Sequence, residues 1–503
     1  MFSSYIIYYS IRIVKLIENL EIMCRKAYHY DTLVINRENS EGKKKNLQVL
    51  LCSENVPPQI NGIARRVGHY AEGLEALGCD VHLLCPGSEG VFSHPNPWNF
   101  TAAMMVLSPT YFIHLMTKSY DIVHVVMPMN FSGIWLLMGY KLLRLWNHNT
   151  QPALVISWHC NIGDYIGHHC PKPLQNICNW LFFDCLMSIL PEFSDRILTP
   201  TKATEKTLTK SWDSHGYNRT GVCYTGVDKQ NFGPTMKDSV SGKIWQARKA
   251  RFLRETNCKY LLLYVGRLSP EKGINELLHC MKRLDGCALW LIGDGPDRPK
   301  YEEMTKQLQI PVEIWGYQNG EALYSSYTAG DIFICPSTTE TFGQCVNEAL
   351  ASEIRVVLPR VKVFTEAFMD HIPQDAFWEP LNELDMARAI KQQLKRHNEC
   401  VEIGRPNATK LHSWTEACTK LQNDYIIAQS FSRTQQDDIR LRKRTIILLP
   451  LWFLVSLLSV IIIYVFYLIR LFIGLLSLNY SRLLTNKTSS TNWKKNIQGC
   501  IKG

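Results

Sequence analysis

The sequence predicts an α/β protein with two domains, each built on a parallel β-sheet, followed by a C-terminal membrane-spanning helix. Three observations support this prediction. Short apolar segments typical of buried strands alternate with segments of helical periodicity, which is the pattern of βαβ units. The pattern begins near residue 46 and starts again after residue 245. A run of 25 residues without a charge, Thr445–Ile469, then lies near the C-terminus.

Length, composition and charge agree with this organisation. A chain of 503 residues corresponds to two or three domains. With 46% apolar and 20% charged residues, an extensively disordered chain is excluded. The net charge of +10 belongs to the tail, because the segment from Ile439 to the end holds ten basic residues and no acidic one. The preceding 438 residues are therefore neutral, which argues against a nucleic-acid-binding protein.

The first domain is expected at residues 46–245, after an N-terminal extension over residues 1–45. Predicted strands cover residues 47–52, 81–84, 122–126 and 154–157. A helix is predicted over residues 63–77 and ends at Gly78, a residue that commonly terminates helices. The apolar and aromatic start of the extension is interpreted as an interfacial helix, with a secretory signal and a disordered extension as alternatives.

The second domain is expected at residues 246–430, with its last helix as a candidate to cross back onto the first domain. Its predicted strands cover residues 260–265, 288–292, 312–315, 332–335 and 356–358. Both domains should be Rossmann-like, with the carboxyl ends of the two sheets facing a shared cleft. Small ligands favour such a position.

The charge-free run at residues 445–469 is long enough to cross a bilayer as a helix. Four basic residues precede it, namely Arg440, Arg442, Lys443 and Arg444. Basic residues favour the cytosolic side, so we expect a single-pass membrane protein with a cytosol-facing body. Residues 470–503 form a basic tail. The expected location is the endoplasmic reticulum or another endomembrane.

Seventeen cysteines raise the possibilities of disulfides and of zinc. The count is odd and no Cys-x-x-Cys occurs, so we expect reduced thiols that serve mostly as small core residues. One cluster is a candidate zinc site: His159, Cys160, His168, His169, Cys170 and Cys178. Its spacing matches no common zinc pattern, and we favour a structural role.

Two loops between a predicted strand and a predicted helix have the composition of phosphate sites. Gly62 opens the helix after the first strand, where backbone N–H groups can receive an anion. A plain structural turn explains Gly62 equally well. Arg267 and Lys272 lie in the loop after the strand at 260–265, and two cations there suit a diphosphate. They would stabilise the charge that develops on a diphosphate leaving group. The alternative is a solvated surface loop.

A third loop follows the strand at residues 332–335 and carries sugar-binding chemistry. The carboxylate of Glu340 can accept hydrogen bonds from sugar hydroxyls, and Gly343 lets the backbone approach a ligand closely. Glu348 lies eight residues after Glu340 in the following helix, where it can accept from the vicinal diol of a ribose. A charged helix face would explain Glu348, but not Glu340 and Gly343 at the end of a strand.

Together these motifs resemble the retaining GT-B glycosyltransferases of the family four type over about residues 47–430. The matching segments are PPQINGIARRV, SDRILTPTKA, YTGVDKQNF, LLYVGRLSPEKGI, LWLIGDGP and PSTTETFGQCVNEAL. The resemblance implies that Gly62, Arg267 and Lys272 bind the donor diphosphate and that Glu348 binds the ribose. It places Glu340, Thr341, Phe342, Gly343 and Gln344 at the donor sugar. The Ser157–Cys160 segment resembles an acceptor-side Ser-x-His motif, so that His159 and Glu340 are the implied catalytic residues.

Within that family, the chain resembles the sulfoquinovosyl-diacylglycerol synthases and related lipid glycosyltransferases. The implied activity is retaining transfer from a nucleotide-sugar donor, most simply a UDP-sugar, to a membrane lipid, with diacylglycerol as one candidate. No cofactor is expected and no metal is required, because Arg267 and Lys272 supply positive charge. Alternatives are an N-acetylglucosaminyltransferase acting on phosphatidylinositol, a mannosyltransferase acting on a dolichol-linked acceptor, and an anchored nucleotide-binding subunit without turnover.

The chain departs from the family pattern in two places. Many members have two glycines where this chain has Asn61-Gly62. Many also carry a Gly-Gly-x-Pro-Glu-like stretch where this chain has residues 360–366, RVKVFTE. The identity of the donor sugar therefore stays open at this point.

Overall fold

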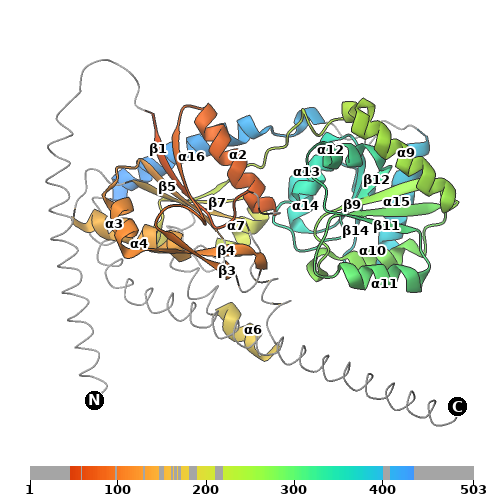
Figure 1. Cartoon of the computed structure of the whole chain (residues 1–503), viewed down its shortest axis with the longest axis horizontal. Coiled ribbons are helices and arrows are strands. Elements are labelled where there is room, and N and C mark those ends of the chain that lie inside the picture. The colour runs from red at the N-terminus through yellow and green to blue at the C-terminus, as the bar shows by residue number, and fades with distance from the viewer. Residues whose placement is uncertain are drawn as a thin grey trace, which may run out of the picture.

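In the computed structural model of the protein, the described residues are 46–57, 59, 61–96, 99–127, 131–146, 152–159, 163, 167, 172–180, 190–209, 219–399 and 408–435. Two six-stranded parallel sheets form two units that lie next to each other (Figure 1). The predicted α/β architecture with two parallel sheets is confirmed. The N-terminal extension, the expected membrane helix and the basic tail lie outside the described residues. Among the residues that are described, no helix is long and apolar enough to cross a membrane.

The first sheet has the strand order β2-β1-β5-β6-β7-β8. Its strands are β1 (Gln48–Cys52), β2 (Asp80–Leu84), β5 (Ile122–Met127), β6 (Ala153–Trp158), β7 (Arg196–Thr199) and β8 (Thr220–Val222). An antiparallel hairpin of β3 (Val91–Asn96) and β4 (Asn99–Leu107) accompanies this sheet. The sequence pattern did not predict the hairpin, because its first strand carries Pro95 and Asn96, which are poor strand residues.

Helices cover both faces of the first sheet. They are α2 (Gly62–Ala76), α3 (Pro109–Thr117), α4 (Phe131–Trp146) and α7 (Lys202–Leu208), with the 3₁₀ turn η2 (Leu190–Phe193). Helix α6 (Lys172–Asn179) lies apart from the sheet (Figure 1). Alternate side chains of β1 enter two different apolar clusters, with Leu50 and Cys52 in one and Val49 and Leu51 in the other. Burial on both faces explains why these strands read as continuous apolar runs.

The second sheet has the strand order β11-β10-β9-β12-β13-β14. Its strands are β9 (Tyr260–Val265), β10 (Cys287–Ile292), β11 (Val312–Gly316), β12 (Ile332–Ile334), β13 (Arg355–Pro359) and β14 (Phe377–Trp378). Its helices are α9 (Val240–Glu255), α10 (Ile274–Met281), α11 (Arg298–Leu308), α12 (Gly320–Ala329), α13 (Gln344–Ala351), α14 (Lys362–Phe368) and α15 (Glu383–Asn398). Short 3₁₀ turns are η4 (Pro234–Asp238), η5 (Pro270–Lys272), η6 (Gln374–Ala376) and η7 (Ala408–Lys410).

The strand order of the second sheet reverses beside β9. The chain runs from β9 outward to β10 and β11, and then returns to β12 on the other side of β9. The loops after β9 and β12 therefore leave the carboxyl edge of the sheet in opposite directions. Open α/β sheets bind ligands at this kind of position. The Arg267/Lys272 loop follows β9 and the Glu340 loop follows β12, so the fold brings both predicted motifs to the same edge.

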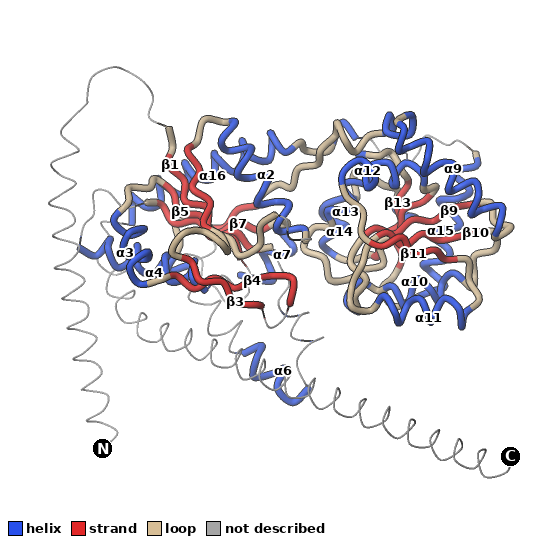
Figure 2. Tube along the Cα trace, viewed as in Figure 1, coloured by secondary structure: helices blue, strands red, loops and turns tan. Residues whose placement is uncertain are grey.

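The final helix, α16 (Trp414–Gln435), follows the second sheet in sequence but packs on α2, β6 and β7 of the first (Figures 1 and 2). Arg196 on β7 donates to Asp424 on α16 at 2.8 Å, and both side chains are largely buried. The boundary expected at residue 245 falls inside α9, which packs against β9 and α12. Helix α9 therefore packs with the second sheet, where Trp245 is buried against Trp290 and Trp315.

Candidate functional site

The loop after β9 places Lys272 at the carboxyl edge of the second sheet. Pro270–Lys272 forms a 3₁₀ turn that ends at Gly273 with a φ of 67°. A Cβ atom on Gly273 would lie 2.5 Å from the carbonyl oxygen of Pro336, so glycine allows this loop to pack directly on the loop after β12. Across that contact, Lys272 Nζ lies 2.6 Å from Glu340 Oε1. The two motifs that the sequence predicted separately are therefore joined by an ion pair.

The electrostatics of this loop are positive. Burial acts to lower the pKa of Lys272, but the adjacent Glu340 carboxylate outweighs burial and raises the pKa above its ordinary value. Burial acts to raise the pKa of Glu271, but the hydrogen bond from Ser269 and the charges of Lys272 and Arg267 hold it below its ordinary value. Arg267 is half-buried, and its guanidinium donates no hydrogen bond to the described residues. Lys272 remains protonated, and the loop can accept an anion.

The Glu340–Gln344 loop is shaped by packing as well as by polar contacts. Gly343 precedes α13 with a φ of 94°, which is left-handed backbone that favours glycine. A Cβ atom there would lie 2.6 Å from the ring of Phe364. The ring of Phe342 contacts Phe368 edge to face, with centroids 5.4 Å apart. Phe342 and Gly343 therefore have packing roles in this structure, whereas Glu340 carries the charge of the loop.

Two other residues of this loop contact the first unit. Thr341 Oγ1 donates to the backbone carbonyl of His159 at 3.1 Å. The carbonyl of Thr341 accepts from the hydroxyls of Thr201 and Thr204, each at 3.4 Å. Gln344 Nε2 donates to the carbonyl of Gly226 at 3.2 Å. The loop after β12 and the loop after β6 thus meet, and His159 and Glu340 belong to the same junction.

Glu348 lies on α13 with a side chain that is only 3% exposed; Oε2 accepts a hydrogen bond, whereas Oε1 has an ion-pair partner but accepts no hydrogen bond from the described residues. Tyr327 donates to Oε2 at 2.8 Å. Arg65 of α2 forms an ion pair with Oε1 at 2.7 Å and thereby joins the two units. The charge of Glu348 raises the pKa of Arg65 above its ordinary value. The Arg65 side chain is 40% exposed.

At the carboxyl edge of the first sheet, Gly62 begins α2 as predicted. Asn61 caps the helix, because its side chain accepts from the backbone N–H of Ala64 at 2.8 Å. A Cβ atom on Gly62 would meet no atom of the described residues within 4 Å, so none of them covers the helix N-terminus at this point. The helix ends at Ala76, and Gly78 follows it with a φ of 82°, the terminating role that the sequence predicted. Cys79 N donates to Leu74 O at 3.0 Å.

His159 follows β6 and is buried, with 7% of its surface exposed. Neither ring nitrogen has a hydrogen-bond partner among the described residues. Burial, followed by the positive charge of Arg66, lowers the pKa of His159 well below its ordinary value. A neutral imidazole offers one donor and one acceptor, so a role for His159 in catalysis would be that of a hydrogen-bonding partner.

The candidate zinc cluster is not placed as a group. His159 is described, whereas Cys160, His168, His169 and Cys170 lie outside the described residues, and nothing is described of the Cys178 side chain. Over the described part of the chain, no three His, Cys, Asp or Glu side chains gather in a way that could hold a metal ion.

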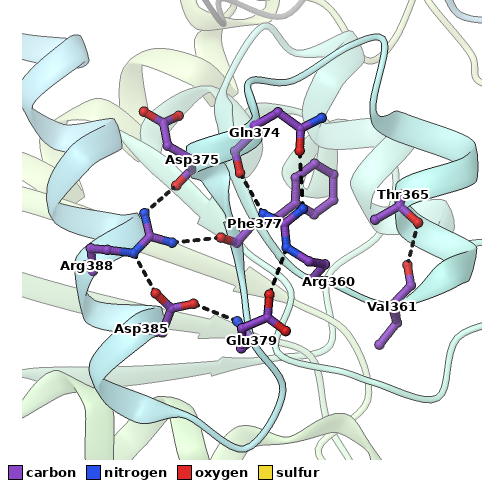
Figure 3. Close-up of polar contacts among 9 residues, drawn as sticks. All are labelled: Arg360, Val361, Thr365, Gln374, Asp375, Phe377, Glu379, Asp385 and Arg388. Carbon is purple, nitrogen blue, oxygen red and sulfur yellow. Dashed lines mark hydrogen bonds and ion pairs between the residues drawn. The ribbon is translucent and has the colours of Figure 1, made fainter.

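The segment that departs from the family pattern, residues 360–366, makes its own contacts (Figure 3). Arg360 pairs with Glu379 at 2.9 Å and donates to the carbonyl of Gln374 at 3.1 Å. At the other end, Glu366 accepts from the backbone N–H of Lys202 and Ala203 at the start of α7. Glu366 and its partners Lys202 and Ala203 are more than 160 positions apart in the sequence. Sequence spacing alone therefore could not reveal that Glu366 binds the start of α7.

Comparisons with known proteins fit this geometry. Residues 60–231 match the family described as Glycosyltransferase Family 4, and residues 246–410 match Glycosyl transferases group 1. The chain is 25% identical over 410 residues to sulfoquinovosyl transferase SQD2 of Arabidopsis thaliana, with 76% of this chain and 74% of that protein covered. It is 25% identical to a GDP-mannose-dependent alpha-mannosyltransferase of Mycobacterium tuberculosis (62% and 79% covered). It is 24% identical to alpha-monoglucosyldiacylglycerol synthase of Acholeplasma laidlawii (67% and 86% covered).

Among solved structures, the fold is similar to that of sucrose-phosphate synthase from Thermosynechococcus elongatus. The TM-score is 0.55 at 18% sequence identity, and the match covers 76% of this chain and 98% of that one. This likeness supports the two-sheet fold.

Proposed function

Because the chain belongs to the GT-B glycosyltransferases of group 1 and family 4, we propose that it transfers a sugar from a nucleotide-sugar donor to a membrane lipid with retention of anomeric configuration. The observation that carries this proposal is the Lys272–Glu340 ion pair, 2.6 Å long, at the point where the strand order reverses. A cation and a carboxylate that touch at this edge match a donor with a diphosphate on one side and a sugar on the other.

In the proposed reaction, the bond between the anomeric carbon and the diphosphate oxygen breaks, and the diphosphate leaves with its charge. Lys272 and Arg267 stabilise that charge. Glu340 accepts hydrogen bonds from hydroxyls of the donor sugar, and Glu348 accepts from the ribose. The acceptor hydroxyl attacks from the face that the leaving group departs, and its proton passes to a phosphate oxygen. The proposal therefore assigns no residue as a nucleophile.

The proposed acceptor is a membrane lipid. Two relatives, sulfoquinovosyl transferase SQD2 and alpha-monoglucosyldiacylglycerol synthase, carry names of glycolipid enzymes. The charge-free run at residues 445–469 supports a membrane anchor, with the large N-terminal body facing the cytosol. Leu174 and Ile177 of helix α6, and Trp180 directly after it, are exposed to solvent over 36%, 54% and 57% of their surfaces. Such apolar side chains on the first unit suit an approach to lipid.

The donor is proposed to be a UDP-sugar, and diacylglycerol is the first acceptor to test. Purified full-length protein in detergent is incubated with a panel of UDP- and GDP-sugars and with diacylglycerol, phosphatidylinositol and dolichyl acceptors. Mass spectrometry then reports glycosylated lipid and free nucleotide. The expected result is a new glycolipid with one donor class, lost in Lys272→Met. Nucleotide that is bound but never consumed with any acceptor would instead identify a non-catalytic subunit.

A further inference from the structure

Arg65 forms an ion pair with Glu348, the residue to which the proposed function assigns the donor ribose. Its guanidinium lies 2.7 Å from Glu348 Oε1, and Tyr327 donates to Oε2 at 2.8 Å. With both partners present, the Glu348 side chain is only 3% exposed. A vicinal diol donates two hydrogen bonds, one toward each carboxylate oxygen. It cannot reach a carboxylate covered in this way unless one of the two partners moves.

Of the two partners, Arg65 is the one able to move. Tyr327 is fully buried in α12 and packs against Phe333 and Phe232. Arg65 lies on the first turn of α2 and is 40% exposed. Its guanidinium lies 5.9 Å from the ring centroid of Phe232, which is the outer limit of a cation–π contact.

After it releases Glu348, the Arg65 side chain remains at the N-terminal end of α2. Gly62 and Arg65 are three residues apart in α2, so they share one face of the helix. Gly62 lies at the N-terminus of that helix, where the diphosphate is proposed to bind. An Arg65 side chain that moves away from Glu348 therefore stays on the face of α2 that carries Gly62, the proposed position of the donor diphosphate.

We propose that Arg65 is a gating residue, which holds Glu348 while the donor is absent and is displaced by the ribose diol when a nucleotide binds. This inference rests on the proposed function, because it requires Glu348 to be the ribose ligand. Since Arg65 and Glu348 belong to different units, displacement also releases one link between the two sheets. Donor binding is thereby coupled to a change in the contact between α2 and α13.

The test compares UDP with 2′,3′-dideoxy-UDP, which lacks the diol, by isothermal titration calorimetry on the full-length protein in detergent. Arg65→Gln removes the competitor, so its affinity for UDP should rise about twofold to fivefold, the size of a partly exposed ion pair. The affinity for the dideoxy nucleotide should not rise. Arg251→Gln is the control, because Arg251 is 63% exposed and pairs with Glu255 on the surface of α9. It should leave both affinities unchanged.

Each outcome bears on a specific claim. If Arg65→Gln binds UDP no more tightly than wild type does, Arg65 does not gate the ribose site. The same conclusion follows if its affinities for UDP and for the dideoxy nucleotide rise by the same factor. If neither protein binds UDP or GDP, the proposed function fails and the gate fails with it. Thermal unfolding without nucleotide shows whether Arg65→Gln is folded. If Arg65→Gln does not fold, Arg65→Met takes its place, because methionine also lacks a charge that could pair with Glu348, and the same gain restricted to UDP is required.

Discussion

Replacing Lys272 by methionine tests the proposed role of the positive loop most directly. The change removes the ammonium group that lies 2.6 Å from Glu340 Oε1 and keeps the apolar stem of the side chain. If Lys272 stabilises the departing diphosphate, its loss should lower kcat by roughly 10²–10³. Steady-state kinetics with the donor and lipid identified in the panel would measure this effect.

The same change has a cost in stability that can be separated from catalysis. Lys272 is the one side chain among the described residues that hydrogen-bonds to the Glu340 carboxylate, whose side chain is 17% exposed. Leaving this carboxylate unpaired should lower the free energy of unfolding by on the order of 1–3 kcal/mol. The double variant Lys272→Met/Glu340→Gln leaves no unpaired charge at this position. Most of the lost free energy of unfolding should therefore return, while kcat stays low. Urea unfolding of the wild type and of these two variants would measure the stability effects.

Lys249 provides a matched control in the same unit. Its ammonium lies 2.6 Å from Asp331 Oδ1, and the two side chains are 18% and 11% exposed. Lys249→Met should therefore destabilise the protein by about 1 kcal/mol, since Asp331 keeps its hydrogen bond from the Leu261 N–H. It should leave kcat unchanged. Near-normal kcat in Lys272→Met, or an equal loss of kcat in both lysine variants, would refute the assignment of Lys272.

Three further predictions concern the ribose carboxylate, membrane attachment and pH. Glu348→Gln should raise the donor KM more than it lowers kcat, whereas Glu340→Gln should lower kcat and keep UDP affinity, as calorimetry and kinetics can show. Removing all residues from Ile439 onward should release the protein from carbonate-washed membranes; continued pelleting would point to residues 1–20. Burial lowers the pKa of His124 from 6.5 to about 3. The unfolded chain therefore takes up a proton between pH 6.5 and 3 that the folded protein does not, and stability should fall on acidification through this range. Urea midpoints at pH 7 and pH 5 should differ less in His124→Gln than in wild type.

Much of the site was predictable because its residues follow strands. Apolar runs at residues 260–265 and 332–334 identify β9 and β12, and parallel strands end at a common edge. Lys272 and Glu340 could therefore be expected to lie near each other. The hairpin β3–β4 had no such signal. The contact of Phe364 with Gly343 was also hidden, because the sequence indicates a position for close backbone approach without indicating what approaches it.

The sequence by itself determined the two parallel sheets, the placement of the charged loops at strand ends, and the membership of the chain in its family. These features depend on local periodicity, on turn chemistry and on short motifs, all of which are visible within a few residues. Only the tertiary structure decided that Arg65 covers Glu348, that Thr341 contacts His159, and that α16 returns to the first sheet. Each of these contacts joins segments more than 180 residues apart. Such pairings depend on how two separately folded sheets meet, and neither segment carries information about its distant partner.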